Sequence, residues 1–362
     1  MTDPTPFLDS TAAVGDGAEL SRRMQRDGYL FVRRLLPPEP LETLRLKFLR
    51  IAGDAGWVAR GEPLAEAVAD LDGFCVEPQP EYMSVYAEMY KLQEFHALQH
   101  HPAILGLLER MCGDGERPKR VSGESQRDSH RRLREAKPSV IPHPRIIGRT
   151  IFPQREAYTT PAHQDFVPIQ GTADTWTAWF PLHDLSPEMG GLQVAEGSHT
   201  SGVYEFRPAL GAGGLEVTDP LEGRWRSSLM NQGDVLFFHS LCVHKGVSNT
   251  GSTLRQSIDA RFQRPGDPIE EKSLLPHVNP VTWEEIYAGW PNRDYQYYWK
   301  EWNLSFIEYD YSYLEERDRL AFEMAAAGDE RARSALQRIV SRDADPEKRR
   351  RAEVALVSLD AS

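Results

Sequence analysis

The sequence predicts a mainly β protein with flanking helices, and two observations carry this prediction. Between about residues 145 and 265, short apolar runs alternate with Gly, Pro, Asn and Asp turns, as in a β-sandwich or jelly roll. The residues on either side instead show apolar spacing and composition typical of helices. A chain of 362 residues allows one large domain or two ordinary ones, and we expect one domain over residues 1–362.

Composition and charge narrow the classes of protein to consider. The chain carries 54 acidic and 42 basic residues, a formal charge of -12, which disfavours a nucleic-acid partner. It has no apolar run long enough to span a membrane and no secretory signal at its start. Three cysteines suggest neither a disulfide framework nor a zinc cluster. We therefore expect a cytoplasmic protein that binds neither nucleic acid nor membrane.

The N-terminal part reads as a loose leader followed by a helical region over residues 21–144. Residues 1–20 form the leader, and Asp27–Val32 reads as a turn and a short strand. After Pro37, the spacing of Leu41, Leu44, Phe48 and Ile51 predicts an amphipathic helix. A second helix is expected to begin after Pro102 and to stop near Gly113.

Residues 114–142 are crowded with charge and nearly free of large apolar side chains. A mobile surface loop is one interpretation of this composition. A flap that attracts an anionic substrate is the other.

The central region contains five apolar runs that we predict to be strands of a 145–265 core. They are Arg145–Phe152, Thr175–Leu182, Gly191–Ala195, Asp234–His239 and Leu254–Phe262.

Residues 266–362 form an aromatic-rich and then helical C-terminal extension. Ten aromatic residues fall between Trp290 and Tyr313, and we favour packed core or a subunit interface over a substrate lid. From Glu315 onward the composition is helical, with a break at Asp345-Pro346. A homodimer through these helices or the aromatic segment is an open alternative to a monomer.

The chemistry-bearing segment is Thr160-Pro161-Ala162-His163-Gln164-Asp165. In a strand, His163 and Asp165 would point to the same face. A catalytic metal needs a third ligand, and His244 is the best candidate donor. Two histidines and one carboxylate leave coordination positions open, which suits an iron(II) oxygenase.

His239 is the rival third ligand, because it falls in the same apolar run as His244. Its odd offset from His244 would place it on the opposite face of a regular strand. We therefore choose His244.

Arg255 lies eleven residues after His244, and Ser257 shares its face if the segment is a strand. An arginine fork beside a hydroxyl is well shaped to hold a carboxylate. The distal carboxylate of 2-oxoglutarate would suit this pair, while the keto-acid end of that molecule chelates a metal.

These segments resemble the phytanoyl-CoA dioxygenase family of Fe(II)/2-oxoglutarate-dependent oxygenases, over roughly residues 20–265. The resemblance rests on the order and spacing of several short motifs. They are Asp27-Gly28-Tyr29, His163-Gln164-Asp165, Trp176–Leu182, Gly190-Gly191-Leu192, Gly197-Ser198-His199, Gly233-Asp234, His244, Asn249 and Arg255.

The resemblance implies a double-stranded β-helix core, a jelly roll of the cupin-like kind. It also implies iron(II) on His163, Asp165 and His244, and 2-oxoglutarate on Arg255, with Trp179 and Gln164 lining the co-substrate pocket. The charged 114–142 segment and the tail beyond residue 290 have no counterpart in the family pattern. For that reason the acyl-CoA substrate of the family is not carried over.

The expected activity is oxidation of an unactivated C–H bond of a small organic molecule, with O2 consumed and succinate and CO2 released. Asp165 fills the carboxylate position that related halogenases leave to Ala or Gly, which favours hydroxylation. Desaturation, ring formation and epimerisation stay open as outcomes, and secondary metabolism is the expected setting. The alternative class is a non-catalytic jelly-roll protein that binds a metal or acts as a scaffold.

Overall fold

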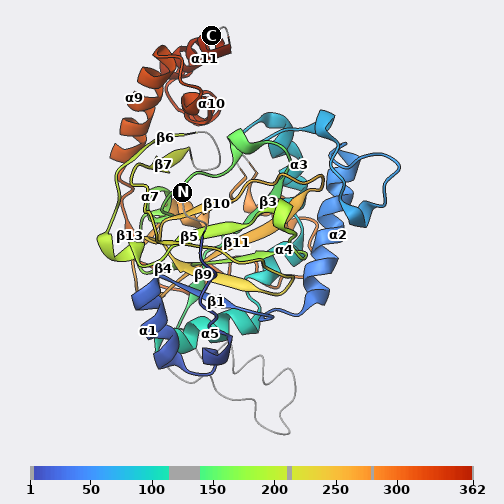
Figure 1. The fold of residues 1–362 in the computed structure, drawn as a ribbon, viewed down its shortest axis with the longest axis vertical. Coiled ribbons are helices and arrows are strands. Elements are labelled where there is room, and N and C mark those ends of the chain that lie inside the picture. The colour runs from blue at the N-terminus through green and yellow to red at the C-terminus, as the bar shows by residue number, and fades with distance from the viewer. Residues whose placement is uncertain (1–3, 114–138, 210–213, 279–280, 361–362) are drawn as a thin grey trace.

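The centre of the molecule is an antiparallel sheet of six strands, seen in a computed structural model that describes residues 4–113, 139–209, 214–278 and 281–360 (Figure 1). Its order is β1-β9-β4-β11-β2, and β3 also pairs with β11. The strands are β1 (Tyr29–Val32), β2 (Ile141–Pro142), β3 (Ile147–Ile151), β4 (Thr175–Pro181), β9 (Val235–His239) and β11 (Arg255–Gln263).

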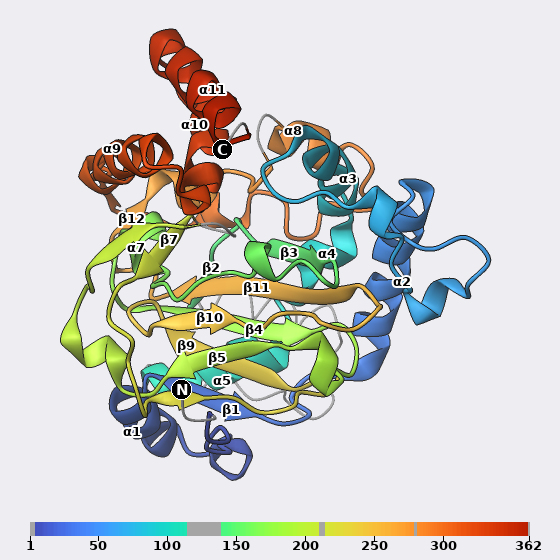
Figure 2. The same cartoon turned by 45° about the horizontal axis from the view of Figure 1, so that its top comes forward.

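A smaller antiparallel sheet lies over one face of the large one (Figure 2). It contains β10 (His244–Gly246), β5 (Leu192–Ala195) and β8 (Trp225–Arg226), in that order. Buried apolar side chains from both sheets fill the space between them, among them Trp179, Phe238 and Val194. The residues next along the strands, such as Phe180 and Phe237, belong to the core on the opposite face. This period of two is what a strand with both faces buried requires.

Helices cover the second face of the large sheet. They are α2 (Pro38–Asp54), α3 (Pro80–Tyr90), α4 (Gln93–Leu98) and α5 (Pro102–Cys112). The predicted helices after Pro37 and Pro102 are confirmed, and Leu41, Leu44 and Phe48 are fully buried. Helix α5 ends at Gly113 in the left-handed conformation, as a glycine C-cap allows. Helices α3 and α4 were not predicted.

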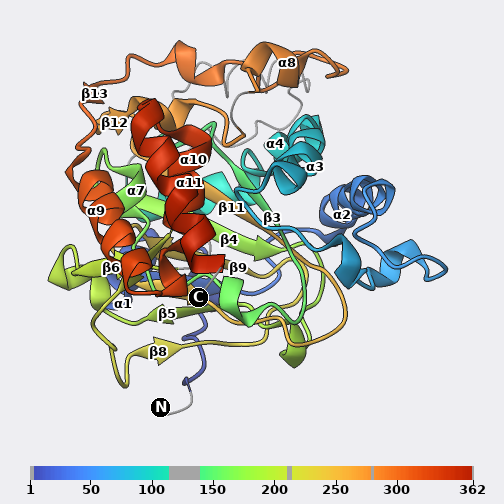
Figure 3. The same cartoon turned by 90° about the horizontal axis from the view of Figure 1, so that it is seen from above.

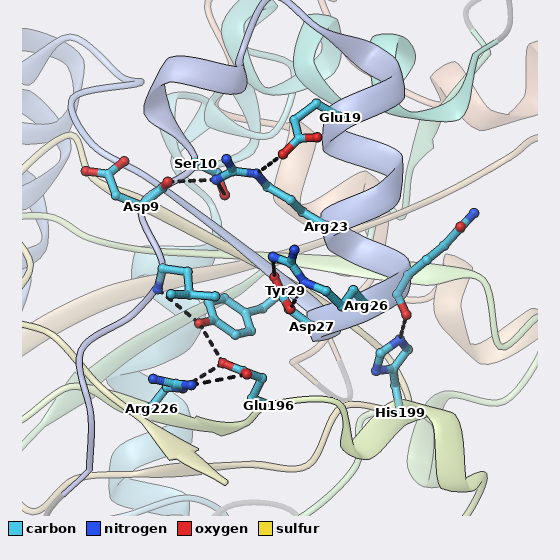
Figure 4. A network of polar contacts seen from close by, with 12 residues as sticks. Asp9, Ser10, Glu19, Arg23, Arg26, Asp27, Tyr29, Glu196, His199 and Arg226 are labelled. Carbon is cyan, nitrogen blue, oxygen red and sulfur yellow. Dashed lines mark hydrogen bonds and ion pairs between the residues drawn. The ribbon is translucent and has the colours of Figure 1, made fainter.

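The expectation of a loose leader is wrong for the described part of residues 4–20. Thr5 pairs with the backbone of β8, and Phe7 is buried between the sheets. Helix α1 (Gly17–Asp27) follows, and Arg23 ties it back to the carbonyl of Asp9 at 2.8 Å (Figure 4). The apolar residues around Phe7 are too few to show a periodicity, so the sequence did not indicate that this segment packs against the sheets.

Gly28 joins α1 to β1 and shows why that junction needs glycine. Its φ is +79°, and a Cβ there would lie 2.5 Å from Nδ1 of His199. His199 in turn meets the carbonyl of Gln25 through Nε2 at 3.0 Å (Figure 4).

All five predicted central strands are present as β3, β4, β5, β9 and β11. The short strands were not predicted: β6 (Phe206–Pro208), β7 (Leu215–Val217), β8, β10, β12 (Ile269–Glu270) and β13 (Phe306–Ile307). Residues 114–138 of the charged segment lie outside the described residues. The end of that segment is β2, so the predicted loop extends too far toward residue 142.

The C-terminal extension is helical, as predicted, and its last three helices stand at the end of the molecule away from α1 and α5 (Figure 1). Figure 3, seen from that end, shows these helices in front of the sheets. It contains α8 (Trp283–Tyr287), α9 (Ser312–Ala326), α10 (Arg333–Arg342) and α11 (Pro346–Asp360). Helices α9, α10 and α11 share a small core of their own. In the aromatic stretch, Trp299 belongs to the main core and its neighbours between residues 290 and 304 pack against it, which confirms the packed-core interpretation for that part of the stretch alone.

The structure also contains a one-turn helix, α7 (Phe166–Ile169), directly after the chemistry-bearing segment. No helix in the described ranges combines the length and the apolar character needed to cross a membrane.

Candidate metal centre

The two candidate histidine ligands are brought together by backbone pairing. His163 and His244 form an isolated antiparallel bridge, in which each backbone N–H donates to the other's carbonyl at 2.9 and 3.0 Å. The imidazole rings therefore project from adjacent backbones, with their centroids 4.2 Å apart. Asp165 completes the group, and the ligand atoms of all three residues lie within 4.8 Å of one another.

A hydrogen bond at Nδ1, the ring nitrogen directed away from Asp165, sets the tautomer of each imidazole. Nδ1 of His163 faces the carbonyl of Pro161 at 2.9 Å, and Nδ1 of His244 faces that of Cys242 at 3.0 Å. A carbonyl can only accept, so Nδ1 carries the proton and Nε2 keeps a free lone pair. Both Nε2 atoms are directed toward Oδ1 of Asp165, at 3.9 and 4.0 Å. Metal-binding histidines commonly have this outer contact.

The Asp165 carboxylate is held by two neighbours that the sequence did not single out. The Thr177 hydroxyl on β4 donates to Oδ2 at 2.6 Å. Arg261 on β11 donates to both oxygens, through Nε to Oδ2 at 3.3 Å and through Nη2 to Oδ1 at 3.1 Å. Because these donors fix the carboxylate plane, Oδ1 is presented to the histidines.

The sequence argument that placed His163 and Asp165 on one face needs correction. They do not lie in a strand: His163 is a bridge residue, and Asp165 is the αR residue before α7. The side chains meet because the chain turns into α7, not because of strand parity. The prediction of which residues converge nevertheless agrees with the geometry.

Burial and neighbouring charges give the three side chains the protonation states that a metal requires. Burial lowers the pKa of His163 to about 3, and the nearby His244 adds to the effect. Burial likewise lowers the pKa of His244. For Asp165, burial alone would raise the pKa, but Arg261 and the two histidines hold it well below its ordinary value. Two neutral imidazoles and one carboxylate result at neutral pH.

His239 lies outside this group. It ends β9, whereas His244 begins β10, so the two residues do not share a strand as the parity argument assumed. Its Nε2 meets Oδ1 of Asp174 at 3.3 Å instead. The choice of His244 over His239 therefore agrees with the structure, although for a different reason.

Arg255 lies buried beside the metal-ligand group, in a narrow pocket that His163, Asp165 and His244 also line. Its Nη1 donates to the carbonyls of Met189, Gly191 and Val247. In the described part of the chain no carboxylate lies within 4 Å of it, and its buried Nε has no acceptor. Burial, with Arg149 nearby, lowers the pKa of Arg255 to about 10. An anionic ligand would supply the missing partner.

Trp179 lies where the sequence suggested, and Ser257 follows Arg255 along the same strand. Ser257 lies two residues after Arg255 on β11, and its buried hydroxyl has no hydrogen-bond partner. Trp179 on β4 lines the same pocket as Arg255. Trp179 thus lies in the pocket of the unmatched guanidinium, whereas Ser257 is not among the residues that line that pocket.

Gln164 is not brought to the pocket, which corrects its expected role. Its amide nitrogen donates to the carbonyls of Gly202 and Leu241, and its oxygen accepts from the backbone N–H of Tyr204. Every polar atom of the side chain is thus used to hold loops together. Between two ligands that face the metal position, the intervening side chain is directed elsewhere.

A much larger cavity adjoins this pocket, since Arg149, His163 and Asp165 line both. Its volume is ≈ 1010 Å³, at the upper end of the usual range of about 300–1,000 Å³ for small-molecule sites. The C-terminal extension supplies much of its wall, including Tyr309, Arg317 and Arg342. The metal position therefore lies where a small pocket meets a large cavity.

Two histidines and a carboxylate that converge between the sheets of a jelly roll define a class, the non-haem iron oxygenases. The sequence model of one family of that class, phytanoyl-CoA dioxygenase (PhyH), matches residues 24–257. The chain belongs to this family. It is an Fe(II)/2-oxoglutarate-dependent oxygenase that acts on a small molecule.

Similar proteins include a hydroxylase, a dioxygenase and an epimerase. The 1-deoxypentalenic acid 11-beta-hydroxylase of Streptomyces exfoliatus is 26% identical over 275 residues, 73% of this chain and 87% of that protein. Peroxisomal phytanoyl-CoA dioxygenase of Homo sapiens is 26% identical over 128 residues, 33% of this chain and 38% of its own length. The solved structure of the epimerase SnoN with Fe3+, alpha ketoglutarate and nogalamycin RO aligns at 17% identity and a TM-score of 0.46, covering 71% of this chain and 86% of that one.

Proposed function

We propose that His163, Asp165 and His244 hold the iron of this oxygenase, and that Arg255 with Ser257 holds the distal carboxylate of 2-oxoglutarate. The reaction we propose is hydroxylation of an unactivated C–H bond in a small organic substrate, with release of succinate and CO2. The single observation that carries the proposal is the convergence of the three ligand atoms within 4.8 Å beside a buried, unmatched guanidinium.

The donor set supports iron as the occupant. Two imidazole Nε2 atoms and one carboxylate oxygen suit Fe(II) and leave positions for two further ligands and O2. The outer contacts of His163 and His244 hold these lone pairs in place, and Thr177 prevents Asp165 from turning away. When bound, the iron supplies the oxidative step with O2 and 2-oxoglutarate.

Arg255 has the features of a carboxylate anchor. Its Nη1 is fixed by three backbone carbonyls, so the rest of the fork is held in one orientation. The Ser257 hydroxyl offers one further donor. Trp179 and Phe238 line the pocket with apolar surface and would exclude water from the co-substrate.

The size of the cavity and the names of similar proteins support a substrate from secondary metabolism. A volume of ≈ 1010 Å³ accommodates a molecule of several rings. The similar Streptomyces protein is named as an 11-beta-hydroxylase of 1-deoxypentalenic acid. Hydroxylation is favoured because Asp165 leaves no vacancy at the carboxylate position for a halide.

The proposal is tested by supplying 18O2 to the iron-loaded enzyme with 2-oxoglutarate and a panel of polycyclic natural products. Succinate formation that a panel member stimulates, with one 18O atom in the product, is the expected result. Conversion to a desaturated, cyclised or epimerised product without 18O would contradict hydroxylation but keep the co-substrate chemistry. If no succinate forms with any compound, and none forms without a compound, the result would contradict both the hydroxylation and the co-substrate chemistry.

We also propose a cytoplasmic location and a homodimer formed through the C-terminal helices. Cys75 and Cys242 are free thiols, which supports a reducing compartment. Val354 and Val357 on α11 are 58% and 68% exposed, which supports an apolar contact there. Sedimentation velocity should show a dimer that a Val354→Ser, Val357→Ser double variant dissociates, and a monomeric wild type would contradict this assembly.

A further inference from the structure

The large cavity brings positive charge from distant parts of the chain around one point. Arg145 and Arg149 come from the β3 region, Arg261 from β11 and Arg342 from the end of α10, and all four line the cavity. They surround the buried His277, whose pKa is well below its ordinary value because of burial first and then these four guanidinium groups. The cluster joins the jelly roll to the C-terminal extension.

Three of the four arginines have a carboxylate partner. Arg149 pairs with Asp259 at 2.8 Å, and Arg261 pairs with Asp165 at 3.1 Å. Arg342 lies 3.6 Å from Glu77, which also faces His277 at 3.7 Å. The last of these pairs is the loosest, because Glu77 is shared.

Arg145 has no carboxylate within 4 Å among the residues that the structure describes. Its Nη1 donates to the carbonyls of Lys272 and Pro276, both at 3.3 Å, which holds the guanidinium at the cavity wall. Burial lowers the pKa of Arg145, with Arg261 and Arg342 adding to the effect. A half-buried cation beside two others is unfavourable unless an anion joins it.

The acidic residues of the cavity do not fill this role. Asp318 contacts Arg338 and lies 2.7 Å from Lys348, and Lys348 also pairs with Asp343 at 2.9 Å. Glu270 accepts the backbone N–H of Lys272 at 2.8 Å. Of the four arginines, Arg145 is thus the one without a direct carboxylate contact in the described part of the chain, and a ligand carboxylate would supply that contact.

Aromatic side chains provide a complementary surface for the rest of a ligand. Trp283, Tyr309 and Tyr311 line the same cavity. The ammonium of Lys272 lies over the rings of Tyr309 and Tyr311, 3.6 and 4.2 Å from their centroids, and so helps to hold that wall in place.

We infer that the substrate carries a carboxylate that binds between Arg145 and Arg342, so that helix α10 of the C-terminal extension completes the substrate site. Arg145 is the fixed half of this anchor. Arg342 is the adjustable half, since its contact with Glu77 is long. The inference rests on the proposed function, because that function places the iron at the other end of the cavity.

The test uses two probes of equal shape, adamantane-1-carboxylate and adamantane-1-carboxamide. Each is titrated calorimetrically into the anaerobic enzyme saturated with Fe(II) and 2-oxoglutarate, so that Arg255 is already occupied. The acid should bind more tightly than the amide by about tenfold or more, as a charge-assisted pair with a half-buried guanidinium implies.

Arg145→Met should remove most of this preference, and Arg342→Met should reduce it several-fold. Arg145→Lys should restore part of it, because the charge returns without the fork. Arg319→Met is the matched control, since Arg319 is an exposed arginine of α9 paired with Glu316 and Glu323, and it should behave as wild type.

Equal affinity for the two probes, no binding of the acid, or an acid preference that survives in Arg145→Met would overturn the inference. The visible band of the Fe(II)/2-oxoglutarate complex, recorded on the same samples, separates the two proposals. An intact band without acid preference contradicts the carboxylate anchor alone. Loss of the band in the wild type contradicts the proposed iron and co-substrate site.

Discussion

The hydrogen bond from Thr177 to Asp165 offers a test of the metal centre that spares every proposed ligand. In Thr177→Val the side chain keeps its shape and loses the hydroxyl that contacts Oδ2 at 2.6 Å. A hydrogen bond to a charged group contributes about 1.5–3 kcal/mol, and loss of such an outer contact costs about 10–100-fold in metal affinity. Arg261 still donates to both carboxylate oxygens. We therefore expect a loss of iron affinity at the lower end of this range, about tenfold.

The assay is Fe(II) binding under anaerobic conditions, measured by competition with a chromogenic chelator. Thr175→Val is the matched control, because Thr175 is equally buried on the same strand and donates to the carbonyl of Thr172 at 3.0 Å. Both variants should lose about 1 kcal/mol or more of unfolding free energy. Only Thr177→Val should lose iron affinity. Wild-type affinity in Thr177→Val, or an equal loss in Thr175→Val, would refute the reasoning.

Three further predictions address the co-substrate, the third ligand and the pH dependence. Arg255→Ala should raise the apparent Kd for 2-oxoglutarate at least tenfold while iron binding stays near wild type in the same chelator assay. His244→Ala should abolish succinate formation, whereas His239→Ala should retain most of it; the reverse order would assign the wrong histidine. Burial lowers the pKa of His96 from 6.5 to about 4, so the unfolded chain binds more protons in that interval, and stability should fall as the pH drops from about 6.5 toward 4. Replacing His96 with Gln should reduce the loss of unfolding free energy between about pH 7.5 and about pH 5 by about 2 kcal/mol, and an unchanged loss in urea titrations would contradict this.

The core strands and the ligand group could be predicted from the sequence because their signals are local. Apolar runs such as Thr175–Pro181 have both faces buried, so they appear as continuous stretches bounded by turns. His244 is the first residue of β10 and Arg255 is the first residue of β11, so a single connection separates the two strands. Because this connection is short, two residues that are close in the sequence also lie close together in the structure.

The supports of the site were not predicted, because they depend on contacts distant in sequence. Arg261 and Asp165 are 96 residues apart. A signal for Arg261 was present: Arg255, Ser257, Asp259 and Arg261 alternate along β11, and three of the four line the pocket or the cavity. Thr177 gave no comparable signal within an apolar strand.

Gln164 and the cavity wall show two other limits of local patterns. The resemblance suggested a pocket role for Gln164, yet its amide holds the backbone of Gly202, Tyr204 and Leu241. The aromatic stretch was expected to be core or interface, and part of it is core. Tyr309 and Tyr311 also line the cavity that contains His163, and no periodicity connects residues so far apart.

The most direct test of the central claim is the visible spectrum of the anaerobic enzyme with Fe(II) and 2-oxoglutarate. Chelation of the keto acid by iron on His163, Asp165 and His244 should give the weak metal-to-ligand band of such complexes, at one iron per chain. The band should be absent in His244→Ala and should need far more 2-oxoglutarate in Arg255→Ala. A wild type without the band, or a His244→Ala variant that keeps it, would contradict the claim.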